Sequence, residues 1–216
     1  MSTPADNLPA AVARHGIELP EAQVALLERY CELLWQWNAK INLTRHTDYE
    51  KFVARDLVDS LAFAEFLQPG EKILDVGTGG GVPGVVLAIV RGDLDVWLCE
   101  SVGKKARAVA DIVEKLRLQV PVVRGRAEDV LTEEHFQTLV LRAVGRLGKL
   151  LTWFGPRWDA FDRMLLIKGP SWAEERGEAR HHGLLRDLEL RKLTSYPLPG
   201  TGSQSVLLQI RRSNRP

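Results

Sequence analysis

Cysteine is scarce in this chain of 216 residues. Only Cys31 and Cys99 are present, each lies in an apolar run, and neither has a CxxC or Cys/His neighbour. Metal sites and disulfide-stabilised folds need cysteines clustered at characteristic spacings. The pattern therefore favours two buried, reduced thiols, as in a cytoplasmic protein, and we expect no metal site.

Long apolar runs are absent as well. No stretch of the sequence approaches the roughly 20 apolar residues that a bilayer-spanning helix needs. The segment from Met1 to Ala13 lacks the basic start and the apolar core of a secretion signal. We expect a protein without a membrane segment that works in the cytoplasm.

Charge of one sign does not dominate the chain. The 29 Lys and Arg residues almost balance the 28 Asp and Glu residues, and the formal net charge is +1. Residues 141–169 nevertheless hold six cations against two acids, and residues 205–216 hold three arginines and no acid. Such segments fit a local phosphate-binding face or an ordinary solvated face equally well.

The first 68 residues are predicted to be helical. Apolar residues at three-to-four spacing predict an amphipathic helix over 20–39. A second helix is predicted over 48–67, where Thr47 and Glu50 have the spacing of a capping box. Pro69-Gly70 then breaks the chain.

From Lys72 onward, short apolar strands alternate with helices. We predict strands at 72–76, 94–100, 120–124, 138–141, 163–168, 188–196 and 205–210, and helices at 83–90, 103–116, 148–158 and 172–185. This alternation indicates an α/β fold with a mostly parallel sheet and helices on both faces. The last two strands follow each other through the loop 197–204, which predicts an antiparallel hairpin at one edge. A helical extension, 1–68, and an α/β domain, 69–216, would form one compact unit.

The strongest chemical signal is the turn Asp75-Val-Gly-Thr-Gly-Gly-Gly-Val-Pro-Gly84, which follows an apolar strand and opens a helix. Glycines permit positive φ and let the backbone approach a ligand closely. The carboxyl end of the first strand of an open sheet is also where nucleotides bind. A purely structural turn explains four glycines within residues 77–81 poorly, so we predict a nucleotide-type cofactor.

An acid stands at the end of the second predicted strand. Glu100 follows Gly81 by 19 residues, where a carboxylate can accept hydrogen bonds from both hydroxyls of a ribose. Next to the glycine turn, this role is favoured over that of a surface glutamate. The third strand ends in Arg126-Ala127-Glu128-Asp129, which fits an adenine-side loop nearly as well as an acidic helix start.

Two cofactors fit this pattern. Gly79, Gly81 and Gly84 match GxGxxG, which is typical of dinucleotide-binding proteins. Asp75 and Gly77 instead give DxGxG, and a carboxylate there would oppose a pyrophosphate but tolerate a sulfonium cofactor with an α-amino group. This charge argument and the terminal hairpin favour S-adenosylmethionine.

Three further residues border the same predicted crevice. Arg142 ends the fourth strand, where it can bind a substrate phosphate or guanine O6, a role favoured over a surface salt bridge. Lys168 ends the fifth strand. Trp172 follows it and can stack a base, although a tryptophan more often serves in packing.

Together these motifs resemble the RsmG (GidB) family of ribosomal RNA methyltransferases. The resemblance runs from about Glu21 to Arg211 and rests most on Asn42-Leu43-Thr44 combined with the glycine turn. The other matching segments are Trp37-Asn38, Asp59-Ser60-Leu61, Glu100-Ser101 with Lys104-Lys105, Arg142-Ala143 and Lys168-Gly169.

The resemblance implies a fold, a reaction and a site. The fold would be the class I, Rossmann-like fold of S-adenosylmethionine-dependent methyltransferases, with seven strands and extra N-terminal helices. The reaction would be methylation of N7 of a guanosine in 16S ribosomal RNA. The cofactor-binding residues would be Asp75, Gly77, Thr78, Gly79 and Gly81 at the methionine end, Glu100 at the ribose, Ala127 and Glu128 at the adenine, and Arg142 at the junction with the substrate. Arg142 and Lys168 would be the catalytic residues.

The partner implied is 16S ribosomal RNA in an assembled or partly assembled small subunit, with phosphate contacts from the two basic segments, and we expect a monomer. Asp56, Leu141 and Gln204 stand where the family usually has other residues. These departures concern the RNA-contact surface and leave the cofactor site intact.

Two alternatives remain. The first is an NAD(P)-dependent oxidoreductase, although the sequence lacks the Tyr-x-x-x-Lys motif that would support it. The second is a non-catalytic RNA-binding or ribosome-assembly module.

Overall fold

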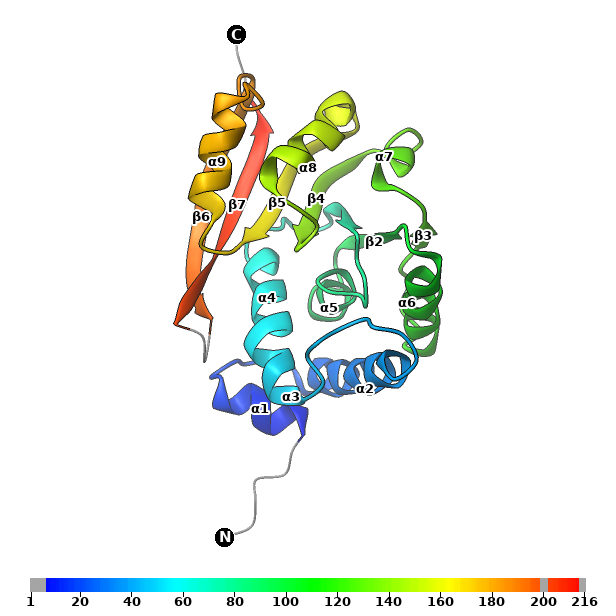
Figure 1. The fold of residues 1–216 in the computed structure, drawn as a ribbon. Helices are drawn as coiled ribbons and strands as arrows, with labels where there is room; N and C mark the ends of the chain where they lie inside the picture. Colours follow the sequence, from blue (N-terminus) through cyan, green and yellow to red (C-terminus); the bar gives the residue numbers. More distant parts are fainter. Residues whose placement is uncertain (1–6, 199–201, 214–216) are drawn as a thin grey trace.

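A seven-stranded sheet forms the centre of the computed structural model, which describes residues 7–198 and 202–213 (Figure 1). The strands are β1 (Lys72–Val76), β2 (Asp95–Glu100), β3 (Val122–Arg124), β4 (Phe136–Arg142), β5 (Phe161–Lys168), β6 (Leu188–Leu198) and β7 (Ser203–Arg212). Their order is β3-β2-β1-β4-β5-β7-β6. The first five strands pair in parallel, while β7 runs antiparallel to both of its neighbours. The predicted α/β sheet with a C-terminal hairpin is confirmed.

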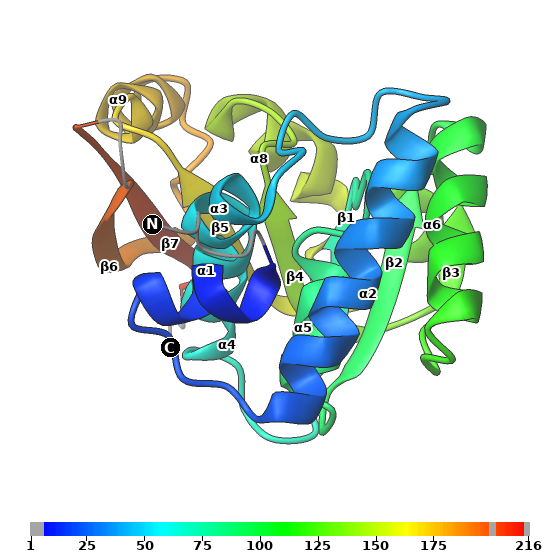
Figure 2. The ribbon, with the colours of Figure 1, turned by 90° about the horizontal axis from the view of Figure 1, so that it is seen from below.

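Helices cover both faces of this sheet (Figure 2). The first face carries α2 (Glu21–Asn38), α4 (Val58–Ala64), α5 (Gly84–Val90) and α6 (Gly103–Lys115), and the second carries α7 (Ala127–Val130), α8 (Leu147–Phe154) and α9 (Trp172–His181). Successive strand residues point to opposite faces, so Ile73 and Leu74 join different clusters of buried side chains. No helix in the described part of the chain is long and apolar enough to cross a membrane.

Helix α1 (Leu8–Arg14) is not among the predicted helices. Asn7 caps it, because its side chain accepts a hydrogen bond from Ala10 N at 2.9 Å. The helix has only seven residues, too few to show a clear helical period in the sequence. Residues 1–6, part of the segment judged to lack a secretion signal, and residues 199–201 of the predicted loop 197–204 lie outside the described residues.

The predicted helix 48–67 is not one regular helix. It begins as α3 (Tyr49–Lys51), widens into a π-helical segment, Phe52–Leu57, and continues as α4. Its cap is Asp48 and not Thr47, because the Asp48 carboxylate accepts from the Lys51 amide at 2.8 Å. Short π-helical segments often occur at functional sites, and this one carries Asp56, which belongs to the site described below.

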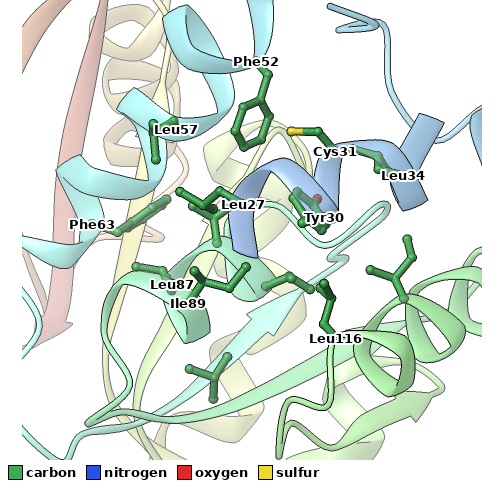
Figure 3. Close-up of a cluster of buried hydrophobic side chains, with 14 of the residues drawn as sticks. Leu27, Tyr30, Cys31, Leu34, Phe52, Leu57, Phe63, Leu87, Ile89 and Leu116 are labelled. Carbon is green, nitrogen blue, oxygen red and sulfur yellow. The ribbon is translucent and has the colours of Figure 1, made fainter. Parts of the chain in front are cut away.

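The N-terminal helices share one hydrophobic core with the sheet. Figure 3 shows Leu27 and Tyr30 of α2 in the same cluster as Leu87 of α5. The buried Tyr30 hydroxyl donates to the carbonyl oxygen of Gly80 at 3.0 Å. A Cβ added at Gly80 would lie 2.7 Å from the Leu34 side chain. Helix α2 therefore packs directly on the glycine turn.

Gly84, the first residue of α5, is needed for close packing of this helix on the sheet. A Cβ there would clash with Leu98 and would lie 2.7 Å from the Asp75 carboxylate. We expect Gly84→Ala to lower the free energy of unfolding by about 1–3 kcal/mol through overpacking. Urea unfolding would measure this, with Gly92→Ala as the control because nothing lies within 4 Å of its added Cβ. Equal stability of the two variants would contradict this packing role.

Both cysteines are free and buried, as predicted. Burial, together with the nearby Glu100 and Asp75 carboxylates, raises the pKa of the Cys99 thiol to about 12. A thiol with so high a pKa stays protonated and unreactive at neutral pH. Neither cysteine therefore belongs to the chemistry of the site.

Candidate active site

The glycine turn joins β1 to α5 at the carboxyl edge of the sheet. Gly77, Gly79 and Gly81 have φ angles of 68°, 60° and 110°, which are left-handed values that favour glycine. The amides of Gly77 and Thr78 both donate to the Cys99 carbonyl oxygen in β2, at 2.9 and 3.0 Å. The turn is thus fixed to the neighbouring strand, and Gly77 is exposed at its outer surface.

Asp75 lies behind this turn and is directed into the protein. Its carboxylate accepts from the Thr78 hydroxyl at 2.6 Å and from the Gly84 amide at 2.8 Å. The residue is only 1% exposed. Burial raises the pKa of Asp75 to about 6, although both hydrogen bonds lower it. Asp75 was predicted beside the amino group of the cofactor, and the structure instead shows it shaping the turn from within.

This raised pKa makes the stability of the fold depend on pH. A carboxyl group whose pKa is higher in the folded state binds its proton more tightly there, so stability is greatest below the ordinary pKa of 3.8 and falls as pH rises through about 6. The loss from this one group reaches up to about 3 kcal/mol. We expect Asp75→Asn to flatten the decline of the unfolding free energy between pH 5 and pH 7, as urea titrations would show. An unchanged slope would contradict the assignment to Asp75.

Glu100 lies at the end of β2, next to the turn. One carboxylate oxygen accepts from the Gly79 amide at 3.0 Å, and the other accepts from the Val102 amide at 2.8 Å. The side chain is fixed in place in this way, and the residue is 5% exposed. A carboxylate offers about four acceptor positions, so two backbone donors leave about two for a ligand.

A cavity of about 270 Å³ opens at the end of β2, where Cys99 and Ser101 on either side of Glu100 line it, and it extends to the ends of β3 and β4 and to helix α8. The predicted Ala127 and Glu128 line it. Its other walls include Val144, Trp153 and Phe154, which the sequence analysis did not assign to a site. Apolar and aromatic walls around a few polar groups are typical of a site for a flat organic ring.

Arg142 at the end of β4 is mostly buried and is held by two acids from the N-terminal helices. Its guanidinium lies 2.5 Å from the Asp56 carboxylate and 3.1 Å from the Asp59 carboxylate. Both acids are 2% exposed. The buried Nη1 nitrogen of Arg142 has no hydrogen-bond partner among the described residues. Arg142 is therefore an anchor between β4 and the N-terminal helices, with one donor unused.

Two further side chains complete this cluster around Arg142. His46 Nδ1 lies 2.9 Å from the Asp56 carboxylate, and the Tyr196 hydroxyl of β6 donates to Asp59 at 2.7 Å. Burial raises the pKa of Asp59, against the lowering effect of Arg142 and Tyr196. Three distant parts of the chain thus meet at one buried charged group.

Lys168, the second predicted catalytic residue, is engaged within the protein. Its ammonium group donates to the Gly145 carbonyl oxygen and pairs with Glu175 at 2.7 Å. Glu175 also accepts from the Leu147 amide at 2.6 Å. These contacts fix the loop that follows Arg142 to the start of α9.

The predicted basic segments do not form one face at this edge. Because β7 is antiparallel, Arg211 pairs with Arg163 at the end of β5 remote from Lys168. Arg163, Arg211 and Arg212 are all in ion pairs with acids. Arg211 and Arg212, which were predicted to contact phosphates, therefore lie away from the carboxyl edge and are paired with acids, and Arg215 lies outside the described residues.

Comparison with known proteins identifies the family. The family model that matches this chain, over residues 23–197, is GidB, described as rRNA small subunit methyltransferase G. The chain belongs to the GidB family. A ribosomal RNA small subunit methyltransferase G of Rhodopirellula baltica is 53% identical over 188 residues, which cover 87% of this chain and 81% of the relative. Its counterpart in Pseudomonas syringae pv. tomato is 33% identical and covers 99% of this chain and all of the relative.

Solved structures show the same fold at low identity. TrmK of M. capricolum in complex with S-adenosyl-homocysteine superposes with a TM-score of 0.57 at 13% identity, covering 72% of this chain and 68% of TrmK. The 23S rRNA methyltransferase ErmE gives 0.54 at 19% identity, covering 75% of this chain and 70% of ErmE. The predictions of a GidB-family, S-adenosylmethionine-dependent methyltransferase of small-subunit ribosomal RNA are confirmed.

Proposed function

We propose that this GidB-family chain transfers the methyl group of S-adenosylmethionine to N7 of a guanosine in 16S ribosomal RNA, using the carboxyl edge described above. The observation that carries the proposal is Glu100. Its carboxylate is fixed by the Gly79 and Val102 amides and keeps acceptor positions for two ribose hydroxyls, and its chain neighbours Cys99 and Ser101 line the cavity. The donor set and the cavity therefore fit this cofactor.

The cofactor would extend from the glycine turn to the cavity. The adenine would lie among Ala127, Glu128 and Trp153, and the methionine end would lie along the backbone of Gly77, which is exposed, and of Gly79, which is half-buried. Thr78 and Gly81 shape this backbone from inside. Asp75 acts behind the turn, through Thr78 and Gly84.

The reaction needs positioning more than acid–base chemistry. When bound, S-adenosylmethionine supplies an electrophilic methyl group, which the lone pair of N7 attacks as the carbon–sulfur bond breaks and its electrons remain on sulfur. N7 carries no proton at neutral pH, so we assign no general base. The protein contributes by holding the base in line with the methyl group, an effect that can lower a barrier by several kcal/mol.

Arg142 is the residue that we assign to the guanine. A cation in contact with N7 would oppose the positive charge of the methylated base, so the unused Nη1 donor would bind O6. Asp56 and Asp59 position the guanidinium for this contact. Lys168 would act indirectly, by fixing the loop that follows Arg142 through Gly145 and Glu175.

The proposal is tested by incubating the protein with labelled S-adenosylmethionine and small subunits from a strain that lacks this enzyme. Label should appear in 16S ribosomal RNA, and borohydride-aniline cleavage should locate it at N7 of a guanosine. Parallel binding measurements with S-adenosylmethionine and NAD should show binding of the first alone. Cofactor binding without any transfer to RNA would instead favour a non-catalytic assembly module. We further propose that the protein acts as a monomer in the cytoplasm, on an assembled or partly assembled subunit.

A further inference from the structure

A groove between α9 and β6 lies outside the candidate active site. Its volume is about 400 Å³, and its walls include Arg176, Arg180, His181 and Arg186 on one side and Leu188 and Leu190 of β6 on the other. None of the residues that line it is an aspartate or a glutamate. The guanidinium groups of Arg176 and Arg180 give this concave surface a positive potential.

The sequence of α9 keeps its acids away from this groove. Glu175 and Glu178 pair with cations of the α/β domain, Lys168 and Arg146, on another side of the helix. Apart from each other, Arg176 and Arg180 have only small or apolar residues three and four positions away, which are Trp172, Ala173, Gly177, Ala179, Gly183 and Leu184. Like charges at i and i+4 destabilise a helix. Repulsion between Arg176 and Arg180 therefore destabilises α9 in the free protein, and a bound anion would offset this repulsion.

Helix α9 links the candidate active site to this groove, whose β6 wall lies at the other end of the sheet, where Leu188 pairs with Arg212. Helix α9 begins at Trp172, shortly after Lys168 ends β5, and lies beside the terminal hairpin (Figure 1). The Arg176 guanidinium lies 5.2 Å from the centre of the Trp172 ring. Arg180 lies one turn further along, at about 6 Å. A polyanion whose target base enters the site would therefore reach the groove by running along α9, over about 12 Å from Trp172 to Arg180.

We propose that the groove between α9 and β6 binds backbone phosphates of the substrate RNA, away from the methylated nucleotide. The inference rests on the proposed function, because it takes RNA as the substrate. Guanidinium groups bind phosphate through paired charged hydrogen bonds, and such contacts set affinity and register without reading sequence. The groove thus increases affinity for the RNA and does not take part in methyl transfer.

The test is the double variant Arg176→Gln/Arg180→Gln, assayed with intact small subunits over a range of salt concentrations. We expect KM for the subunit to rise about tenfold, while kcat and the Kd for S-adenosylmethionine stay unchanged. The slope of log affinity against log salt should fall by about 0.7–0.9 for each phosphate that the variant no longer binds. Arg176→Lys/Arg180→Lys should restore most of the affinity, because the charge is kept.

The matched control is Arg29→Gln/Lys115→Gln, which removes two exposed cations from α2 and α6 on the opposite face of the sheet. Its KM and salt slope should equal those of the unmodified protein. An equal rise in KM in both double variants would show that net charge alone causes the effect, and would overturn the proposal. No effect in the α9 variant would overturn it as well.

Direct binding to protein-free 16S ribosomal RNA separates this inference from the proposed function. Weaker binding of the α9 variant supports the groove even if no methyl transfer is found with the unmodified protein. If the variant transfers methyl groups normally and its RNA binding is unchanged, the proposed function stands and the proposal that the groove binds phosphates is overturned. A KM defect on intact subunits with normal binding to protein-free RNA would point to a ribosomal protein as the occupant, and would overturn the RNA assignment.

Discussion

Replacing Arg142 with methionine is expected to lower the free energy of unfolding by about 3–5 kcal/mol, because it leaves two buried carboxylates without their cation. Asp56 and Asp59 are both 2% exposed, and Arg142 is the cation that they share. Burial already raises the pKa of Asp59, and loss of Arg142 should raise it further. Urea unfolding at pH 7 would measure the loss, and methyl transfer should be abolished.

Two comparisons isolate the charge cluster as the cause of this loss. Arg29→Met removes an exposed arginine that pairs with Glu32 three residues away, and should change stability by less than about 1 kcal/mol. Adding Asp56→Asn and Asp59→Asn to Arg142→Met should recover part of the stability, because the unpaired charges are removed. Methyl transfer should stay low in this triple variant, since the donor assigned to guanine O6 is still missing. A loss below about 1 kcal/mol in Arg142→Met would show that the two acids do not depend on Arg142.

Replacing Glu100 with alanine is expected to raise the Kd for S-adenosylmethionine at least 100-fold, equivalent to about 3 kcal/mol. The variant removes the acceptor for the ribose hydroxyls and leaves the Gly79 and Val102 amides without their partner. Water can reach the exposed Val102, but the half-buried Gly79 amide loses its partner within the turn, so the glycine turn should also become less ordered. Calorimetric titration with S-adenosylmethionine would measure the change in Kd.

The control is Glu114→Ala, which removes an exposed glutamate near the end of α6. Its Kd for the cofactor should match that of the unmodified protein. Glu100→Gln should lie between the two, because an amide keeps one acceptor oxygen but loses the charge. Cofactor affinity that survives Glu100→Ala would refute the ribose assignment while leaving the family membership intact.

The sequence predicted well those features that depend on neighbouring residues. The strand before Gly77, the left-handed glycines and the acid at the end of β2 follow from local patterns, and the structure brings Gly79 and Glu100 into contact. Prediction from the sequence failed where a pattern was short or interrupted. The seven residues of α1 are too few for a period, and the π-helical segment after α3 has no signal in apolar spacing.

The roles of single charged residues were harder to predict. Arg142 and Lys168 were expected to face the substrate, and both are largely engaged by acids of their own chain. Asp75 was expected to face the cofactor and is directed inward. The acids that pair with Arg142 and Lys168 lie on helices. The direction of the Asp75 side chain depends on which side of β1 is buried. The Asp-Ser-Leu segment was noted as a motif, but nothing in its sequence links Asp59 to Arg142.

The order of polar and apolar residues by itself determined the parallel sheet, its terminal hairpin and the position of the glycine turn, because each depends on backbone preferences and on burial over a few residues. Only the tertiary structure decided which acids hold Arg142, since Asp56 is 86 residues away from it in the chain. It also decided which arginines lie near the carboxyl edge, because the direction of β7 carries Arg211 and Arg212 to the opposite end. Long-range electrostatic pairing depends on strand direction and helix packing, and these are fixed only when the whole core assembles.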